Sequence, residues 1–244
     1  MVKASIVIAV FNERENVASV CEDILRKLEP AAPFEVIFVD DGSDDGTPDV
    51  LQAIADKDER VRLVRHGRRC GKSQAVRTGV LFAKGKWIAT LDGDGQNEPA
   101  DLPPMLAKAA AAQGPSPIVA GVRVRRDDPV SRLIATRIAN GFRSAVLGDN
   151  CPDTGCGVKV FERDAFLLLP CFEGMHRFLP ALFQRYGHPV INHEVQHRAR
   201  MKGSSKYTNW GRAIVGVFDM MGVIWLNART RAPLTITEKN RTDS

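Results

Sequence analysis

The sequence predicts an α/β fold in which helices flank a doubly wound, mostly parallel sheet. Short apolar runs rich in β-branched residues alternate with helix-patterned stretches along most of the chain, as in successive strand–helix–strand units. The runs lack the polar alternation of half-exposed strands, so both faces of the sheet are expected to be covered. Three of the runs end in polar clusters, at the edge where such sheets bind ligands.

Each element of the first half has its own signal. Residues 4–10 (ASIVIAV) are a continuous β-branched run and supply the first strand. Residues 12–28 place apolar side chains on one helical stripe, and Pro30 and Pro33 end that helix. Residues 34–39 are the second buried strand. The same criteria predict helix 47–56, strand 61–64, helix 73–83 and strand 87–91.

The second half is expected to complete one domain over residues 1–228, followed by a polar tail at 229–244. The arginine-rich segment at 123–143 is expected to form either a solvated helix face or a surface that binds anions such as the acceptor phosphate or lipid headgroups. The expected elements are helix 101–113, strand 118–122, strand 155–161, helix 175–186, strand 190–195, loop 198–206 and helix 207–227.

The net charge and the cysteine content indicate which classes of partner and which cellular compartment to expect. The net charge of +5 favours anionic partners such as nucleotide phosphates, lipid headgroups or nucleic acid. The five cysteines are an odd number without a C-x-x-C pair, which argues against a disulfide framework or a structural zinc and favours a reducing compartment. We find no signal-peptide pattern and no run near the ~20 apolar residues that span a bilayer. A cytoplasmic protein is therefore expected.

Asp92 and Asp94 directly follow the strand at 87–91, in the run LDGDGQNEP. Alternate residues of an extended chain point the same way, so the two carboxylates can face one point. Oxygen ligands of this kind, with Gln96 nearby, suit Mg²⁺ or Mn²⁺. An acidic glycine turn without a metal has the same local pattern. Similar clusters at 12–13 and 40–41 end the first two strands, and together the three are expected to line one crevice.

Five segments occur in the order and at the spacings that resemble family 2 glycosyltransferases: IAVFNERENV, VDDGSDDGT, LDGDGQNEP, DTGCGVKVF and RMKGSSKY. The resemblance is closest to the polyprenyl-phosphate branch, which includes the dolichol-phosphate mannose synthase-like enzymes, and covers Ser5 to about Tyr207. It implies the Rossmann-like GT-A fold, with a nucleotide-sugar half at about 1–122 and an acceptor half at about 123–228.

The resemblance also implies a set of donor-binding residues. They are Ala9, Phe11, Glu13, Val39, Asp40, Asp92, Gly93 and Asp94. The family usually has Pro and Tyr where this chain has Ala9 and Phe11, so Phe11 keeps a stacking surface and lacks the hydroxyl. The implied ligands of a divalent Mg²⁺ or Mn²⁺ cofactor are Asp92, Asp94 and Gln96.

On the acceptor side, the resemblance implies phosphate contacts from Arg123, Arg132, Arg200, Ser205 and Lys206. A one-residue shift of the alignment would put Ser131 in place of Arg132. Asp153 and Gly157 match a D-x-x-S-G element in which Cys156 replaces the serine. The implied catalytic residues are Asp94, Asp153, Arg200 and Lys206. Asp153 is assigned to positioning, with a general base as the second choice.

The implied activity is inverting transfer of a sugar from GDP-mannose or a UDP-sugar to an undecaprenyl- or dolichyl-type phosphate, at the cytosolic face of a membrane. The expected partners are the nucleotide sugar, the polyprenyl phosphate and the membrane surface, without nucleic acid. Two alternatives stay open. One is a family 2 transferase that extends a glycan hydroxyl and needs Asp153 as a base. The other is a non-catalytic nucleotide-sugar or lipid-binding module.

Three further segments have a structural interpretation beside the functional one. GRRCGKS (67–73) has three residues between its glycines where a phosphate loop has four, so Gly71–Ser73 is expected to begin a helix near the nucleotide. His176 is expected at the surface, outside the site. The apolar helix at 213–226 is too short to span a bilayer and is expected either in the core or at the membrane interface.

Overall fold

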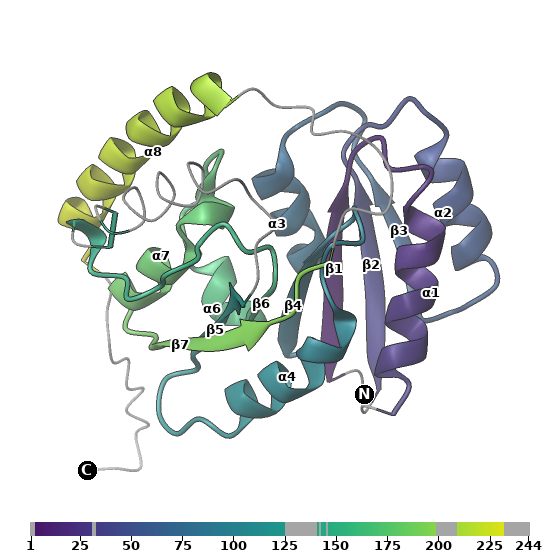
Figure 1. Ribbon diagram of the computed structural model, residues 1–244, viewed down its shortest axis with the longest axis horizontal. Coiled ribbons are helices and arrows are strands. Elements are labelled where there is room, and N and C mark those ends of the chain that lie inside the picture. Colours follow the sequence, from purple (N-terminus) through teal and green to yellow (C-terminus); the bar gives the residue numbers. More distant parts are fainter. Residues whose placement is uncertain are drawn as a thin grey trace, which may run out of the picture.

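The computed structural model describes residues 3–30, 33–124, 141, 143–144, 146–198 and 209–231. Over this part of the chain the strands form one seven-stranded sheet in the order β3-β2-β1-β4-β6-β5-β7 (Figure 1). The strands are β1 (Ala4–Val10), β2 (Phe34–Asp40), β3 (Val61–Arg65), β4 (Trp87–Asp92), β5 (Ile118–Arg123), β6 (Lys159–Glu162) and β7 (Val190–Val195). All neighbouring pairs are parallel except those that involve β6.

Helices cover both faces of this sheet. The helices are α1 (Val17–Leu28), α2 (Thr47–Ala55), α3 (Lys72–Phe82), α4 (Leu102–Ala110), α6 (Arg163–Leu167), α7 (Leu179–Arg185) and α8 (Asn209–Arg229), with 3₁₀ turns η1 (Pro99–Asp101) and η2 (Met175–Arg177). Along β1, Ile6 and Ile8 face the core shared with α1, α2 and α4, whereas Val7 faces the core shared with α3, α6 and α7. Alternate residues of a strand thus serve two cores, which explains the unbroken apolar runs.

The predicted α/β class is therefore confirmed, and several boundaries differ for local reasons. Helix α1 begins at Val17 instead of residue 12, because Asn12 has a left-handed φ of 55° and belongs to the loop that joins β1 to it. The backbone N–H of Asn12 donates to the Ser43 hydroxyl, and the Asn12 side chain forms hydrogen bonds with Asp44.

The expected strand at 155–161 is the shorter β6, and it runs antiparallel to both of its neighbours. The expected helix at 175–186 is divided into η2 and α7, and Pro180 lies in the first turn of α7, where its missing N–H is tolerated. Helix α6 was not predicted, and α4 is shorter than the expected helix 101–113.

Candidate active site

Strand register brings four of the predicted donor residues into two adjacent rows. Ala9 of β1 is paired with Val39 of β2 on one side and with Asp92 of β4 on the other. Val10, the next residue of β1, is paired with Asp40. Since β1 lies between β2 and β4 and all three are parallel, these residues end at one edge of the sheet. This edge is the place where open α/β sheets bind ligands.

The loops after β1 and β2 form one wall of this edge. The guanidinium of Arg69 lies 4.3 Å from the centre of the Phe11 ring, so a flat cation already covers an aromatic face there. Asp40 is fully buried; its carboxylate accepts the Ser43 N–H and is 3.2 Å from Arg65 Nε. Asp40 thus holds the loop that follows it, and its predicted contact with a base stays a prediction.

Asp92, the last residue of β4, forms an ion pair with Lys72, the first residue of α3. Burial alone would raise the pKa of the Asp92 carboxyl, but the positive charge of Lys72 outweighs it, and the pKa lies below its usual value. Burial would likewise lower the pKa of Lys72, and the charges of Asp92 and Asp94 raise it instead. The first residue of α3 therefore places its ammonium group against the carboxylate of Asp92.

Gly157 makes room for the Asp92 carboxylate. A Cβ atom built on Gly157 would lie 2.2 Å from Asp92 Oδ2, closer than any side chain can approach. The carbonyl of Gly157 accepts a 2.7 Å hydrogen bond from the hydroxyl of Thr90, which fixes the glycine over β4. The glycine of the D-x-x-C-G segment thus has a steric reason to lack a side chain.

The loop after β4, which carries Asp94 and Gln96, contacts the segment after β7, which carries His197 and Arg198. Arg198 N–H donates to the Gln96 carbonyl at 2.9 Å, and Gln96 Nε2 donates to the Arg198 carbonyl. His197 lies between them; its Nδ1 is buried and has no hydrogen-bond partner among the described residues. Burial and, to a smaller extent, the charge of Arg123 lower the pKa of His197, so its imidazole is neutral at pH 7.

The residue types of this group are those that a divalent cation prefers, and the predicted metal contacts of Asp92 and Asp94 stay predictions. Two carboxylates, Asp92 and Asp94, are two residues apart, and both act electrostatically on His197 and on Lys72. Carboxylate oxygens are the ligands that Mg²⁺ and Mn²⁺ prefer. The amide nitrogen of Gln96 faces His197 and Arg198, and the predicted metal contact of Gln96 stays a prediction.

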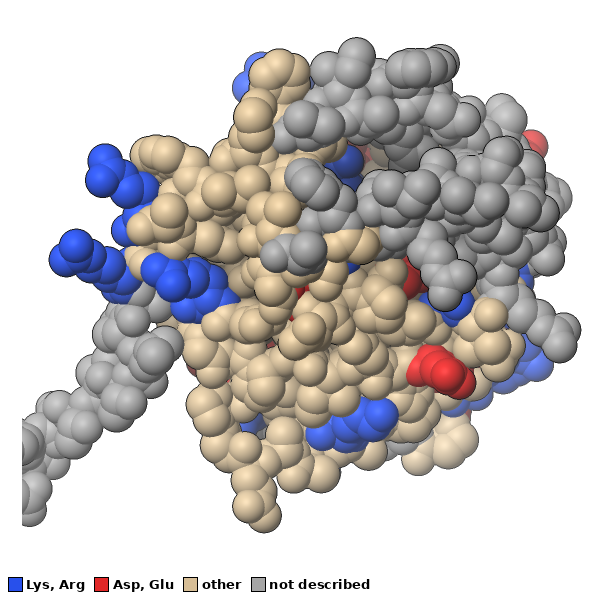
Figure 2. Space-filling view, turned by 60° about the vertical axis from the view of Figure 1, so that its left-hand side comes forward, with Lys and Arg blue, Asp and Glu red and all other residues tan. Residues whose placement is uncertain are grey.

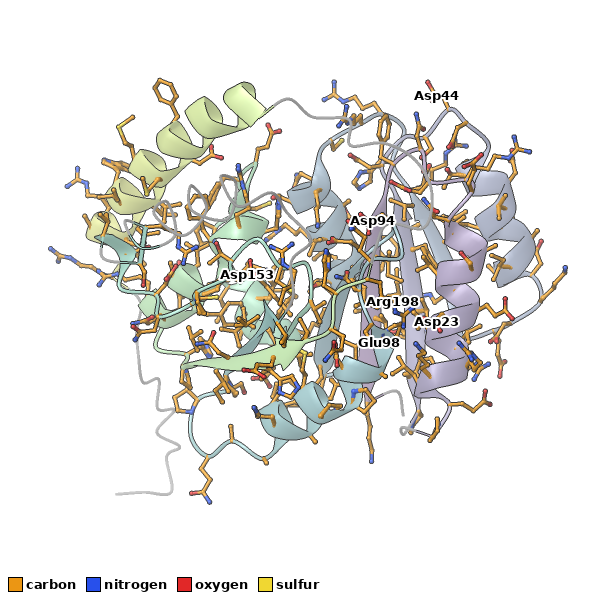
Figure 3. All side chains as sticks on the ribbon, in the orientation of Figure 1. Asp23, Asp44, Asp94, Glu98, Asp153 and Arg198 are labelled. Atoms are coloured by element: carbon orange, nitrogen blue, oxygen red, sulfur yellow. The ribbon has the colours of Figure 1, made fainter. Side chains whose placement is uncertain are left out.

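Arg198 ties this segment to α1 and to the loop after β4. Its guanidinium pairs with Asp23 at 2.9 Å and with Glu98, and Lys27 pairs with the same two carboxylates at 3.2 and 2.5 Å (Figure 3). The network borders a pocket of about 400 Å³. That pocket is lined by residues that include Ser19, Leu91, Asp92, Gly95 and Asn97. Asp23 and Arg198 are 175 positions apart, so no local pattern indicated this contact.

Asp153 is held by Arg123 in a two-pronged ion pair, with Nε–Oδ2 and Nη2–Oδ1 distances of 2.7 and 2.8 Å. Asp153 is buried and Arg123 is partly buried. Burial would lower the pKa of Arg123, but the paired carboxylate raises it. The two residues were predicted as separate groups, a phosphate contact and a positioning residue or base, and the structure joins them into one unit.

His176 belongs to the site, contrary to its expected place at the surface. It is partly buried at the start of η2, and its Nδ1 lies 2.8 Å from the hydroxyl of Ser73. Burial first, then the positive charges of Lys72 and Lys159, hold its pKa well below 6.5. No local pattern indicates this contact, because Ser73 and His176 are 103 positions apart.

Four predicted acceptor residues lie outside the described part of the chain. They are Arg132, Arg200, Ser205 and Lys206. Their predicted roles stay predictions.

Comparison with known proteins supplies the family context for this geometry. The family model "Glycosyl transferase family 2" matches residues 5–168. The undecaprenyl-phosphate 4-deoxy-4-formamido-L-arabinose transferase of Pectobacterium carotovorum is 32% identical over 207 residues, covering 84% of this chain and 62% of that protein. The transferase of the same name from Proteus mirabilis is 31% identical over 238 residues, covering 96% and 70%. The chain thus spans less than two thirds of the first of these relatives.

Solved structures share the fold at low sequence identity. Glucosyl-3-phosphoglycerate synthase from Mycobacterium tuberculosis, in complex with Mn²⁺, UDP-glucose and phosphoglyceric acid, superposes with a TM-score of 0.69 and 19% identity, covering 91% of this chain and 79% of that one. Mannosyl-3-phosphoglycerate synthase from Rubrobacter xylanophilus gives 0.67 and 15%, covering 99% and 79%. These likenesses concern the fold alone.

Proposed function

The chain belongs to glycosyl transferase family 2, and from this membership we propose that it transfers a sugar from a nucleotide diphosphate sugar to a polyprenyl phosphate. The observation that carries the proposal is the Asp92–Lys72 pair at the carboxyl ends of the central strands, in register with Ala9 and Val39. The pair offers a carboxylate that can bind a cation and an ammonium that can bind a diphosphate. The names of the relatives support the polyprenyl phosphate acceptor.

The donor side must stabilise a departing nucleoside diphosphate. As the acceptor oxygen bonds to the anomeric carbon, the bond from that carbon to the diphosphate breaks and negative charge collects on the diphosphate. Lys72 is placed to receive this charge, because its ammonium already lies against Asp92 at the strand edge. A divalent cation held by Asp92 and Asp94 would supply Lewis-acid stabilisation of the same leaving group. Phe11 and Arg69 offer flat surfaces on which a base can stack.

The acceptor phosphate needs little help from a base. A phosphate monoester has a second pKa near ~6, so at pH 7 its attacking oxygen is already largely ionised. Asp153 is paired with Arg123 through both carboxylate oxygens, an arrangement that supports a positioning role. We propose that the pair orients the acceptor side of the site, with Arg200 and Lys206 as the phosphate contacts. Extension of a glycan hydroxyl, which requires Asp153 as a free base, is disfavoured by the same pair.

The membrane part of the proposal rests on α8. Its inner side is anchored by the buried Val223, whereas Phe218, Met221 and Trp225 expose 65%, 50% and 64% of their surface. Figure 2 turns this side of the molecule forward, and most of the described surface there is uncharged, with Lys and Arg at its edges. No described helix is long and apolar enough to cross a bilayer. We propose that α8 lies in the membrane interface, where exposed aromatic residues are favourable.

A donor and acceptor panel tests the function directly. The protein is incubated with Mn²⁺, GDP-mannose or one of several UDP-sugars, and either a short polyprenyl phosphate or a glycan with a free hydroxyl. Release of nucleoside diphosphate together with an organic-extractable labelled lipid supports the proposal. Transfer only to the glycan supports the extension alternative. Donor binding without transfer to any acceptor supports the non-catalytic module.

A further inference from the structure

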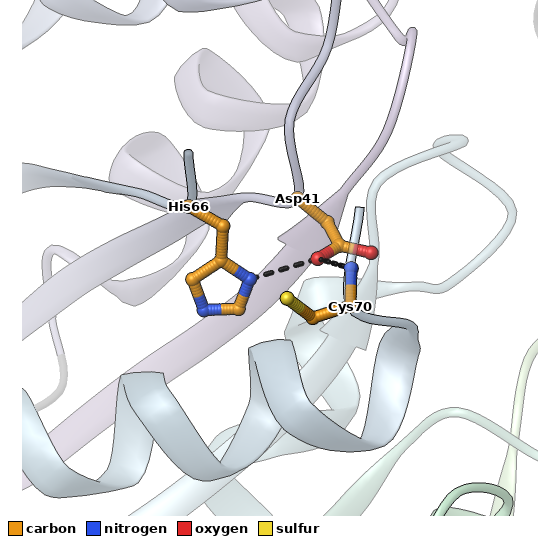
Figure 4. A group of neighbouring side chains, drawn as sticks. All are labelled: Asp41, His66 and Cys70. Carbon is orange, nitrogen blue, oxygen red and sulfur yellow. Dashed lines mark hydrogen bonds and ion pairs between the residues drawn. The ribbon is translucent and has the colours of Figure 1, made fainter. Parts of the chain in front are cut away.

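Three potential metal ligands meet outside the site described above. Asp41 follows β2, His66 follows β3, and Cys70 precedes α3, yet one ligand atom of each lies within 4.8 Å of the other two (Figure 4). We propose that these three residues bind a thiophilic divalent transition-metal ion of the Zn²⁺ class. This site is separate from the Asp92–Asp94 pair.

The ligands are already held close to the positions that an ion requires. His66 Nδ1 lies 2.8 Å from Asp41 Oδ1. Two light-atom ligands about 2.1 Å from a tetrahedral ion are about 3.4 Å apart, so this pair would have to open by only about half an ångström. The backbone N–H groups of Cys70 and Gly71 donate to the two oxygens of Asp41 at 2.8 Å, which fixes both the carboxylate and the residue that carries the thiol.

A supporting contact orients the imidazole. His66 Nε2 lies 2.9 Å from the hydroxyl of Thr78 on α3. A metal-binding histidine commonly donates its second ring N–H to such a partner, and the Thr78 hydroxyl, which can donate or accept, orients the ring in either tautomer. His66 is partly buried and Asp41 is buried, whereas Cys70 is exposed, so the ion has a path from solvent.

The ligand types select a different ion from the one proposed at Asp92 and Asp94. A thiolate with an imidazole favours zinc and other late transition metals, whereas Mg²⁺ and Mn²⁺ favour carboxylate oxygens. Three protein ligands leave a fourth tetrahedral position open to water. The ligand atoms of the two sites therefore favour different ions: carboxylate oxygens favour hard cations, and the thiolate and imidazole favour thiophilic cations.

Ion binding rearranges the protons and contacts of the ligands. An ion bound at Nδ1 requires the ring proton on Nε2, where the Thr78 hydroxyl can accept it. The Cys70 thiol loses its proton to solvent and gives up its weak contact with the Arg68 carbonyl.

Co²⁺ is a suitable probe, because thiolate ligation gives it a near-ultraviolet charge-transfer absorption that oxygen ligands do not. The titration is done on the full chain with excess Mg²⁺, which competes with Co²⁺ for carboxylate ligands and not for a thiolate. Cys171→Ser is the matched control, since Cys171 is the other exposed cysteine. The wild type and Cys171→Ser are expected to show the band at one ion per chain. Cys70→Ser is expected to lose the band, with Co²⁺ affinity at least tenfold weaker.

A second variant separates the cluster from a lone thiol. His66→Asn is expected to weaken Co²⁺ binding at least tenfold while Cys70 remains in place, and circular dichroism checks that the fold is retained. Absence of the band in the wild type, an unchanged band in Cys70→Ser, or equal affinity in a folded His66→Asn overturns the proposal.

Discussion

The ammonium of Lys72 contacts the carboxylate of Asp92, so the first residue of α3 neutralises the last residue of β4. A divalent cation and Lys72 therefore compete for the same carboxylate oxygens. When a donor diphosphate is present, its oxygens provide a second partner for Lys72, and the competition is relieved. Metal and donor are thus expected to bind cooperatively at this edge of the sheet.

Replacing Lys72 by Met should separate these two effects. Without the competing ammonium, Mn²⁺ alone should bind several-fold more tightly in calorimetry. Turnover should fall by about 10²-fold, the size of effect seen when one preorganised group is removed from a developing negative charge. Lys108→Met, on the exposed face of α4, is the control. Unchanged turnover in Lys72→Met would show that Lys72 does not serve the leaving group.

Gly157→Ala should disturb the site through sterics alone. The new methyl would meet the Asp92 carboxylate at 2.2 Å, so Asp92 or the backbone must move. We expect a loss of about 1–3 kcal/mol in the free energy of unfolding, as for other overpacked sites, and a large loss of Mn²⁺-dependent turnover. Gly155→Ala is a matched control, because the nearest atom to its new Cβ is 3.5 Å away. Equal behaviour of the two variants would contradict the steric account.

Asp153→Asn should distinguish positioning from base catalysis. If Asp153 orients Arg123, the amide still accepts a hydrogen bond, and turnover with a polyprenyl phosphate should fall at most about tenfold. A general base would be worth about 10²–10⁴. Asp153→Ala leaves the Arg123 guanidinium without its carboxylate and should cost about 3–5 kcal/mol of stability, measured by urea unfolding. A thousandfold loss in a folded Asp153→Asn would restore the base assignment.

His176 should make stability sensitive to mild acid. Its folded-state pKa lies well below 6.5, so between that lowered pKa and about 6.5 the unfolded chain takes up a proton that the folded chain does not. The free energy of unfolding therefore falls as pH is lowered, by up to about 1.4 kcal/mol per unit from this residue. His176→Asn should lose less stability between pH 7 and pH 5 than the wild type. Parallel urea curves for both proteins would rule out this contribution.

The fold was largely predictable because the strands have local signals. The β-branched runs at 4–10 and 34–39 form β1 and β2, and their parallel pairing follows from the alternation with helices. The antiparallel direction of β6 was not predictable, because it depends on the sheet position between β4 and β5. The late start of α1 depends on contacts of Asn12 with Ser43 and Asp44, more than thirty residues away.

The candidate site was predictable where a polar cluster follows a strand. Asp92 and Asp40 could be placed at one edge because strand ends share an edge in a parallel sheet. His176 and His197 could not, since their places depend on long-range contacts with Ser73 and with the loop after β4. A histidine that is positioned by such long-range contacts has no characteristic neighbours in sequence.

The dependence of sugar transfer on Asp94 and a divalent cation tests the central claim most directly. Transfer from a labelled donor to a short polyprenyl phosphate is measured for the wild type and for Asp94→Asn, each with EDTA and with a series of Mn²⁺ concentrations. The claim predicts labelled lipid from the wild type with Mn²⁺, none with EDTA, and at most about a hundredth of the rate from Asp94→Asn. Equal rates from both proteins, or full transfer in EDTA, would contradict it.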